Sequence, residues 1–302
     1  MNEHAQNGHG DVARPIVTTW ALPLAEHPVL DFYSDFASIA LVPVDDGNPR
    51  MFAQTQGGDL PMVKVETHDE VTRVRVGMEG QRFAFWRNPG KLHLVICVPE
   101  NITGSLATGS GRIDAGRLRG CNLSLESGAG AIRAEDVQGS LKLSTKTGRI
   151  EVLGLSGALN VSSTAGAILA HLEQLEPGTH RVRTRAGAIE IHLKQGLDVG
   201  VDARAHVGHA NVEVPARPDA QAQLEVQTHL GSIRVARLGS ARRIDAEAES
   251  GLAAETSGDD AQELGASPPS VAADEIGRIV SMVVSGRIST HEAEGLLAAL
   301  GV

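Results

Sequence analysis

Apolar and polar residues alternate over a long central region of the chain, from about residue 102 to residue 235. Phrases such as LSLESGAGAIRA (residues 123–134) and LKLSTKTGRIEV (residues 141–152) show the alternation most clearly. Every second position is apolar or small, which is the periodicity of a β-strand with one buried face. The region is therefore predicted to consist of short, half-buried strands.

The same phrase recurs with one glycine at a fixed place, between two alternating runs. These glycines are Gly111, Gly130, Gly148, Gly166, Gly187, Gly208 and Gly231. Their spacing of 18 to 23 residues lies in the range of solenoid repeats. A glycine between two strands predicts a tight corner, because it adopts φ values that other residues resist. The prediction is an all-β fold, a β-solenoid of stacked coils about 4.8 Å apart.

Alignment on this glycine places equivalent residues in columns. Five residues before it the coils carry Leu or Val, three before it Ser or Thr, and two after it Ile. The coil around Gly208 carries Ala203, Ala205 and Ala210 at these positions instead. Each column is expected to form a ladder through successive coils.

The flanks divide the chain into further segments. Residues 1–15 are polar and predicted to be disordered, and residues 16–101 form strands and turns. Because solenoid ends need covering, the latter are predicted to be an N-terminal β cap continuous with the solenoid of residues 102–236. Residues 237–271 are a predicted linker, with room for one degenerate coil.

A small α-helical hairpin is predicted over residues 272–302, with a capping-box pattern at Ser289 and Glu292. Its apolar stripe consists of Ile276, Ile279, Val280, Val283, Leu296, Leu297 and Leu300. Two helices of about three turns bury little surface alone. The stripe is therefore expected to mediate self-association or to bind a protein partner.

Composition narrows the class of protein. The formal net charge of -10 argues against general nucleic-acid binding. The two cysteines form neither a disulfide framework nor a metal motif. No stretch is long and apolar enough to cross a bilayer, and residues 1–15 lack the apolar core of a secretory signal. A cytoplasmic protein is expected, with membrane association left open.

Basic residues gather on the outward face of the first strand of several coils. They are Lys142, Lys146, Arg181, Arg183, Arg185 and Arg204. Stacking in chain order places the coil of Arg204 next to the coil of Arg181. Such a face could bind an anionic polymer, phosphate headgroups or an acidic partner. The alternative is an ordinary solvated face, since outward faces of half-buried strands are normally polar.

Histidines suggest a metal site at one corner, formed by His206, His209 and His229. A second column is expected to hold His171, His192 and Glu213 on successive coils. The alternative is that these side chains face solvent without a ligand, and no cofactor is predicted.

Catalytic signals are weak. The aspartates of the repeats fall in different columns, and no nucleotide-binding or hydrolase motif occurs. The chain is therefore predicted to be a non-enzymatic structural or interaction protein that presents a ladder surface. One alternative is an envelope-stress sensor whose basic face binds anionic lipid, peptide or polymer. A carbohydrate-active β-helix enzyme is the second alternative.

The step VPENI (residues 98–102) and the phrase Leu-x-Leu-x-Ser/Thr…Gly-x-Ile resemble a bacterial family of β-strand-repeat proteins known as putative adhesins. The resemblance covers roughly residues 17–235. The phrase IVSMVVSGRISTHEAEGLLAAL (residues 279–300) looks like the short helical-hairpin modules that follow such repeats and serve oligomerisation. The resemblance implies an adhesin-like role without catalytic residues.

Overall fold

The computed structural model describes residues 16–24, 28–44, 47–55, 61–77, 92–215 and 217–238. These residues form strands and contain no helix, which confirms the all-β prediction for this part of the chain. Consequently, no helix there could span a membrane. The predictions for residues 1–15, for the linker from residue 239 onward and for the hairpin of residues 272–302 lie outside the described residues.

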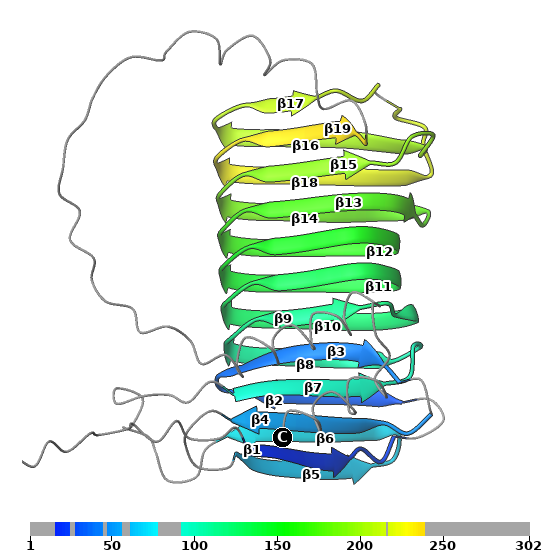
Figure 1. Cartoon of the computed structure of the whole chain (residues 1–302). Coiled ribbons are helices and arrows are strands. Elements are labelled where there is room, and N and C mark those ends of the chain that lie inside the picture. The colour runs from blue at the N-terminus through cyan, green and yellow to red at the C-terminus, as the bar shows by residue number, and fades with distance from the viewer. Residues whose placement is uncertain are drawn as a thin grey trace, which may run out of the picture.

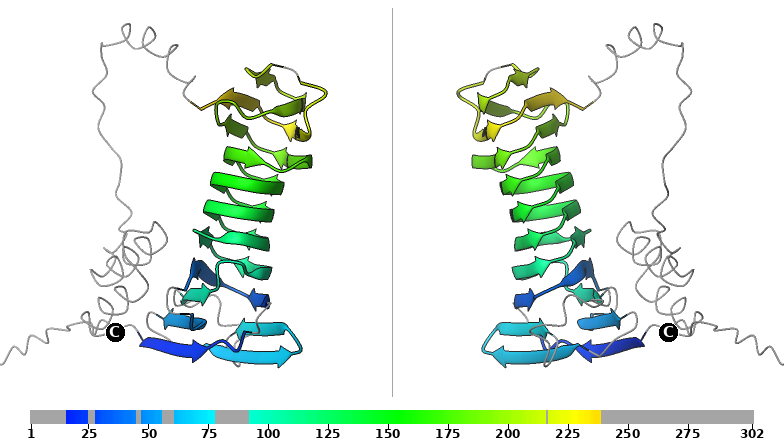
Figure 2. Two further views of the ribbon diagram at one scale, coloured as in Figure 1. Left: turned by 90° about the vertical axis from the view of Figure 1, so that its right-hand side faces the viewer. Right: turned by 90° about the vertical axis from the view of Figure 1, so that its left-hand side faces the viewer.

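The repeat region winds into a stack of coils with two faces, so the fold is β-solenoid-like (Figure 1, Figure 2). Its strands are β8 (Thr103–Ser110), β9 (Ile113–Gly116), β10 (Arg119–Ala129), β11 (Ile132–Thr147), β12 (Ile150–Ala165), β13 (Ile168–Leu175), β14 (Gly178–Ala186), β15 (Ile189–Leu193), β16 (Val199–Val207), β17 (Ala210–Val212), β18 (Ala222–Leu230) and β19 (Ile233–Arg237).

Parallel pairing joins the coils along both faces. The first face comprises β8, β10, the second halves of β11 and β12, then β14, β18 and β16. The second face comprises β9, the first halves of β11 and β12, then β13, β15, β19 and β17. Because β11 and β12 continue from the second face onto the first, the sheet is curled and continuous.

The strands before the repeats are β1 (Ile16–Ala21), β2 (Val29–Ser34), β3 (Ala37–Pro43), β4 (Arg50–Thr55), β5 (Met62–His68), β6 (Val71–Gly77) and β7 (Leu92–Val98). β2 and β3 form another coil, which lies in parallel between β8–β9 and β6–β7. Antiparallel strands then complete this end, with β5 on β6, and β4 and β1 beyond β7.

The corner glycines have the backbone that the sequence predicts, with φ of 143° at Gly148 and 150° at Gly166. They meet a second constraint as well. A Cβ on Gly148 would collide with the carbonyl oxygen of Gly130 on the coil below. Each corner glycine therefore allows both the turn and the close stacking of the next coil.

The columns form a narrow aliphatic core between the two faces. Leu143, Val161 and Ile150 are fully buried. The hydroxyl column is buried beside them, and most of its members hydrogen-bond to the corners: Ser127 Oγ donates to the carbonyl oxygen of Gly111 at 3.0 Å. These bonds satisfy hydroxyl groups that would otherwise be costly to bury. Ser163 Oγ is the exception, with no hydrogen-bond partner among the described residues.

The coils do not stack in chain order at the C-terminal end. β18 pairs with β14 on one side and with β16 on the other, so the last coil in sequence lies inside the stack (Figure 1). The expected contact between the coils of Arg204 and Arg181 is therefore wrong. Glu213 is likewise not beside His192, whose neighbours are His171 and Ala236.

Side-chain size accounts for this order. Leu224 and Val226 of β18 are fully buried inside the stack. The coil of β16 and β17 has alanines in the equivalent columns, and apart from the buried Val199 its apolar residues are half-buried or exposed. Placing the coil with the smallest side chains at the end leaves the least apolar surface in contact with water.

Candidate functional site

Outward side chains of neighbouring strands form rows across the first face, because every second residue of a strand points to the same side. The middle row is Ser144, Ser162, Arg183, Gln227 and Arg204. The same register gives the row next to the glycine corner as Lys146, Thr164, Arg185, His229 and His206. The parallel pairing thus brings basic residues of β14 and β16 onto one surface, separated by β18.

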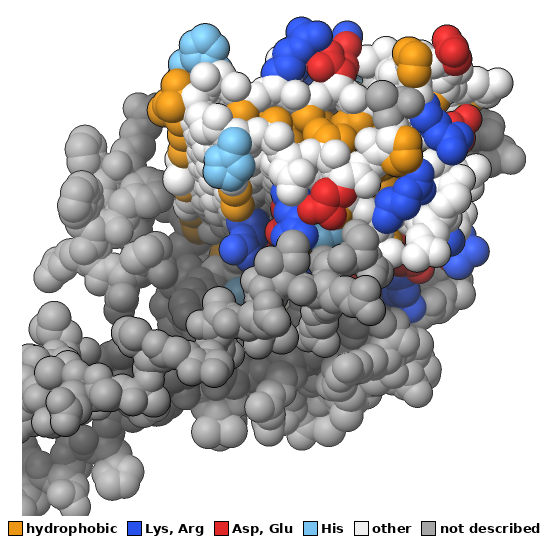
Figure 3. Space-filling view, turned by 90° about the horizontal axis from the view of Figure 1, so that it is seen from above, with side chains coloured by type: hydrophobic (Ala, Val, Ile, Leu, Met, Phe, Trp, Pro, Cys, Tyr) orange, Lys and Arg blue, Asp and Glu red, His pale blue; other side chains and the backbone are white. Residues whose placement is uncertain are grey.

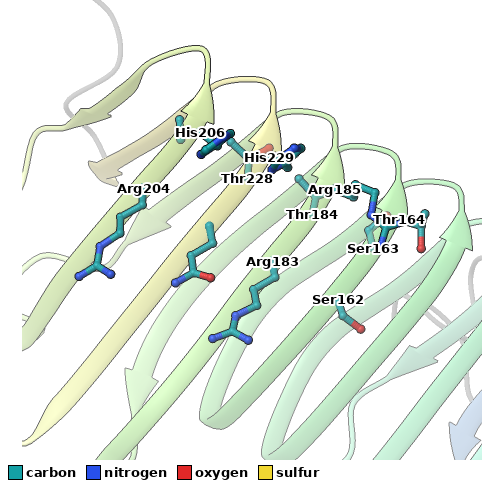
Figure 4. Close-up of a pocket in the computed structure, with 12 residues that line it drawn as sticks. Ser162, Ser163, Thr164, Arg183, Thr184, Arg185, Arg204, His206, Thr228 and His229 are labelled. Carbon is teal, nitrogen blue, oxygen red and sulfur yellow. The ribbon is translucent and has the colours of Figure 1, made fainter.

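An open depression of about 730 Å³ lies over β12, β14, β18 and β16 at these two rows (Figure 4). Its charged and ring-bearing side chains are Arg183, Arg185, Arg204, His206 and His229. Serine and threonine hydroxyls and one glutamine amide complete the polar lining, and none of the described lining residues is acidic. The depression is therefore an acid-free basic surface on a chain with a net charge of -10.

Carboxylates beside the depression neutralise part of the predicted basic face. Glu225 accepts hydrogen bonds from Arg181 at 3.0 Å and from Arg183 at 3.4 Å. Hydrogen bonding to Arg181 is the main reason why the pKa of Glu225 lies below its usual value. Arg204 pairs with Asp202 of its own strand at 2.7 Å.

The remaining predicted basic residues differ in position. Among the described residues, Arg185, Lys142 and Lys146 have no carboxylate within ion-pair distance. Arg185 belongs to the depression, whereas both lysines lie on β11, outside its lining. The structure thus gathers three of the six basic residues at the depression and leaves Arg181 and the lysines beside it.

Sequence reasoning missed the neutral part of this surface. Gln227, Ser162 and Thr164 occupy the same outward rows as the arginines and line the depression. The signal was available, since each stands in a column that the repeat alignment defines. Their position beside the arginines could not be predicted without the order of the coils. Gln227 lies between Arg183 and Arg204 only because β18 lies inside the stack.

In both histidine columns, the side chains of neighbouring strands contact each other through their rings. The rings of His206 and His229 are stacked with centroids 4.7 Å apart, and those of His171 and His192 meet edge-on at 4.9 Å. Burial, with a smaller contribution from His192, lowers the pKa of His171. Within the described part of the chain, no group of three or more His, Cys, Asp or Glu side chains could hold a metal ion. His209 therefore does not complete the metal corner that its spacing suggested.

A comparison with protein families identifies the family of the repeat region. The Toastrack DUF4097 profile matches residues 99–251. The chain belongs to the Toastrack DUF4097 family. This confirms the resemblance of the repeats to a putative adhesin family, and the depression lies inside the matched Toastrack region. A comparison with curated proteins gives no match.

Solved structures show distant likeness to this Toastrack protein. A putative cell adhesion protein from Clostridium sporogenes is 9% identical with a TM-score of 0.36, covering 74% of this chain and 100% of that chain. A putative adhesin from Bacteroides fragilis is 14% identical with a TM-score of 0.39, covering 74% and 97%. A putative lipid binding protein from Parabacteroides distasonis is 9% identical with a TM-score of 0.34, covering 74% and 96%.

The Toastrack match begins at Pro99, just after β7. The coil of β2 and β3 therefore lies outside the matched region, although it pairs with β8 and β9 as one more coil of the same stack. In this chain the Toastrack stack is extended by residues that precede it in sequence.

Proposed function

We propose that this Toastrack protein is a non-enzymatic binding protein whose first face binds an acidic polysaccharide. The acid-free depression supports this function, because it concentrates guanidinium and imidazole groups on an otherwise acidic chain. Guanidinium groups bind carboxylate and sulfate with paired hydrogen bonds. The predicted hairpin of residues 272–302 would add self-association or a protein partner to this adhesin-like role.

The layout of the depression favours a polymer with repeated acidic groups. Arg183 and Arg204 project from the same face (Figure 4). The strand register places Gln227 between them in one row. The two guanidinium groups, each also paired with a neighbouring carboxylate, thus lie two coils apart, roughly 10 Å at the spacing of β-strands. Amide and hydroxyl groups between them can exchange hydrogen bonds with sugar hydroxyls.

Other ligand classes fit this surface less well. Ala205 is the one apolar residue among the described lining residues, so the depression offers no bulky side chain to insert into a membrane. It also has no aromatic platform on which nucleic-acid bases could stack, apart from the two imidazoles. Glycoside hydrolysis normally needs a pair of carboxyl groups at the bound sugar, and the lining supplies none.

Binding to alginate, a polymer of uronate sugars, tests the proposal. The double substitution Arg183→Gln with Arg185→Gln is expected to weaken binding by about tenfold or more, because it removes two charged hydrogen-bond donors. Arg149→Gln is the control, since Arg149 is exposed but lies outside the depression, paired with Glu151. Affinity is measured by titration calorimetry at two salt concentrations, with neutral dextran as the comparison polymer.

The proposal requires alginate binding that weakens with salt and with the double substitution, and that Arg149→Gln leaves unchanged. Equal loss in both variants would show a nonspecific charge effect and contradict it. Binding only to vesicles that contain phosphatidylglycerol would favour the envelope-stress alternative, in which the basic face meets anionic lipid.

A further inference from the structure

Within the described part of the chain, the C-terminal end of the stack is open on the side of β16. Among the described residues, β16 pairs with β18 on one side and has no strand on the other. Seen from above, hydrophobic side chains gather over this end between histidine, basic and acidic side chains (Figure 3). An edge strand with free N–H and C=O groups is a ready template for another strand.

Apolar side chains of β16 are less covered than those of the neighbouring coil. Val201, Ala203 and Ala205 are half-buried, whereas Leu224 and Val226 one coil below are fully buried. Val207 is 54% exposed at the end of the same strand. This end would gain buried apolar surface if another molecule covered it.

The exposed part of β16 is complementary to itself when it runs antiparallel. Val199 and Gly200 are buried, so the accessible edge begins at Val201 and reads Val-Asp-Ala-Arg-Ala to Ala205. With Ala203 opposite its own copy, Asp202 of each chain faces Arg204 of the other. A shift of two residues would instead place Asp202 opposite Asp202, or Arg204 opposite Arg204, and like charges directly opposite are destabilising.

We propose that a second copy of this chain docks on this end, with the two β16 strands antiparallel about a two-fold axis that passes between the two Ala203 residues. Asp202 and Arg204 are 50% and 72% exposed and are joined at 2.7 Å within one strand, so both can turn toward the second copy. An isologous contact of this kind repeats each charge pair twice and closes after two chains.

The pairing has a consequence for the first face. A two-fold axis between antiparallel strands is perpendicular to their sheet, so both first faces point the same way. The depressions of the two copies then lie side by side across the β16 pair. The dimer does not depend on the proposed ligand, and each is tested by a different measurement.

Charge reversal on the full chain tests the dimer by sedimentation velocity over a range of protein concentrations. Asp202→Arg places two basic residues opposite one another across the contact, and Arg204→Asp places two acidic residues opposite one another. Each single variant is expected to raise the dimer dissociation constant at least tenfold. The double variant Asp202→Arg with Arg204→Asp restores opposite charges in the same register and is expected to recover the dimer.

Arg149→Gln serves as the control of unchanged assembly, and circular dichroism verifies that each variant keeps its strands. A wild-type chain that stays monomeric at all concentrations would overturn the proposal. So would single variants that associate as the wild type does, which would place the contact elsewhere, including at residues 272–302. Failure of the double variant to recover the dimer would also overturn it.

Discussion

At the scale of single residues, the corner glycines answer two separate requirements. Gly148 has a φ of 143°, which side-chain-bearing residues rarely adopt. Its Cβ position is also occupied by backbone of the neighbouring coil. Gly178 shares the first requirement, with a φ of 130°, but has open space at its Cβ position. Comparison of Gly148 with Gly178 therefore separates the cost of backbone strain from the cost of a steric collision.

Gly148→Ala is expected to lower the free energy of unfolding by more than Gly178→Ala does. Strained φ alone costs about 1–3 kcal/mol at either site. At Gly148 the coil below must also move, and backbone cannot move as a flexible side chain does. Urea denaturation followed by circular dichroism measures both variants. Equal decreases in the free energy of unfolding would mean that the neighbouring coil shifts at little cost. The positive φ alone would then explain why glycine occupies this column.

At the scale of elements, the sequence predicts which residues of each coil are equivalent, but it does not predict which coils are adjacent in the stack. Alternation and glycine spacing are local, so they locate strands and corners within each coil. No local sequence pattern shows which coils are neighbours. The segment between β17 and β18 allows β18 to return to a position between β14 and β16. One signal was present, since Ala203, Ala205 and Ala210 mark a coil with little to bury, which suits the end.

The candidate site shares this limit. Arg183, Arg185 and Arg204 were predictable as outward residues from their columns alone. Their arrangement was not, because the depression depends on β18 lying between β14 and β16. The carboxylate of Glu225 reaches Arg181 and Arg183 for the same reason.

Engineered disulfides can test the coil order. Residues paired across parallel strands lie about 5 Å apart between Cα atoms, within the range of roughly 4.4–6.8 Å that a disulfide spans. Arg183→Cys with Gln227→Cys is therefore expected to oxidise readily to an intrachain disulfide. Arg183→Cys with Arg204→Cys joins positions two coils apart and is expected to stay reduced. Thiol labelling and mass spectrometry measure both; stacking in chain order predicts the opposite result.

At the scale of the whole molecule, the two ends of the stack differ in how well they are closed. One continuous core runs from Leu22 to Val235. At the N-terminal end it includes Phe32 and Met51, both almost fully buried, and antiparallel strands cover it. The other end finishes in the alanine-rich coil of β16 and β17, whose residues from Val201 onward are half-buried or exposed. A stack held by neighbour contacts loses structure first where those contacts are weakest.

Denaturation by urea is therefore expected to begin at the coil of β16 and β17. The chain has two tryptophans, Trp20 and Trp86, and both precede the repeats in sequence, so fluorescence reports on the N-terminal part alone. Far-UV circular dichroism reports on every strand. The dichroism transition is expected to precede the fluorescence transition by about 0.5 M urea if the ends differ by ~1 kcal/mol.

Varying the protein concentration distinguishes the low local stability of the β16 end from the effect of the proposed dimer on it. If a second copy covers β16, higher concentration stabilises that end through mass action and draws the dichroism transition toward the fluorescence transition. In Asp202→Arg the gap between the two transitions should not change with concentration. Coincident transitions at every concentration would instead show that the whole stack unfolds as one unit. In that case the core shared by all the coils outweighs the difference between its ends, and local exposure at β16 does not decide where unfolding starts.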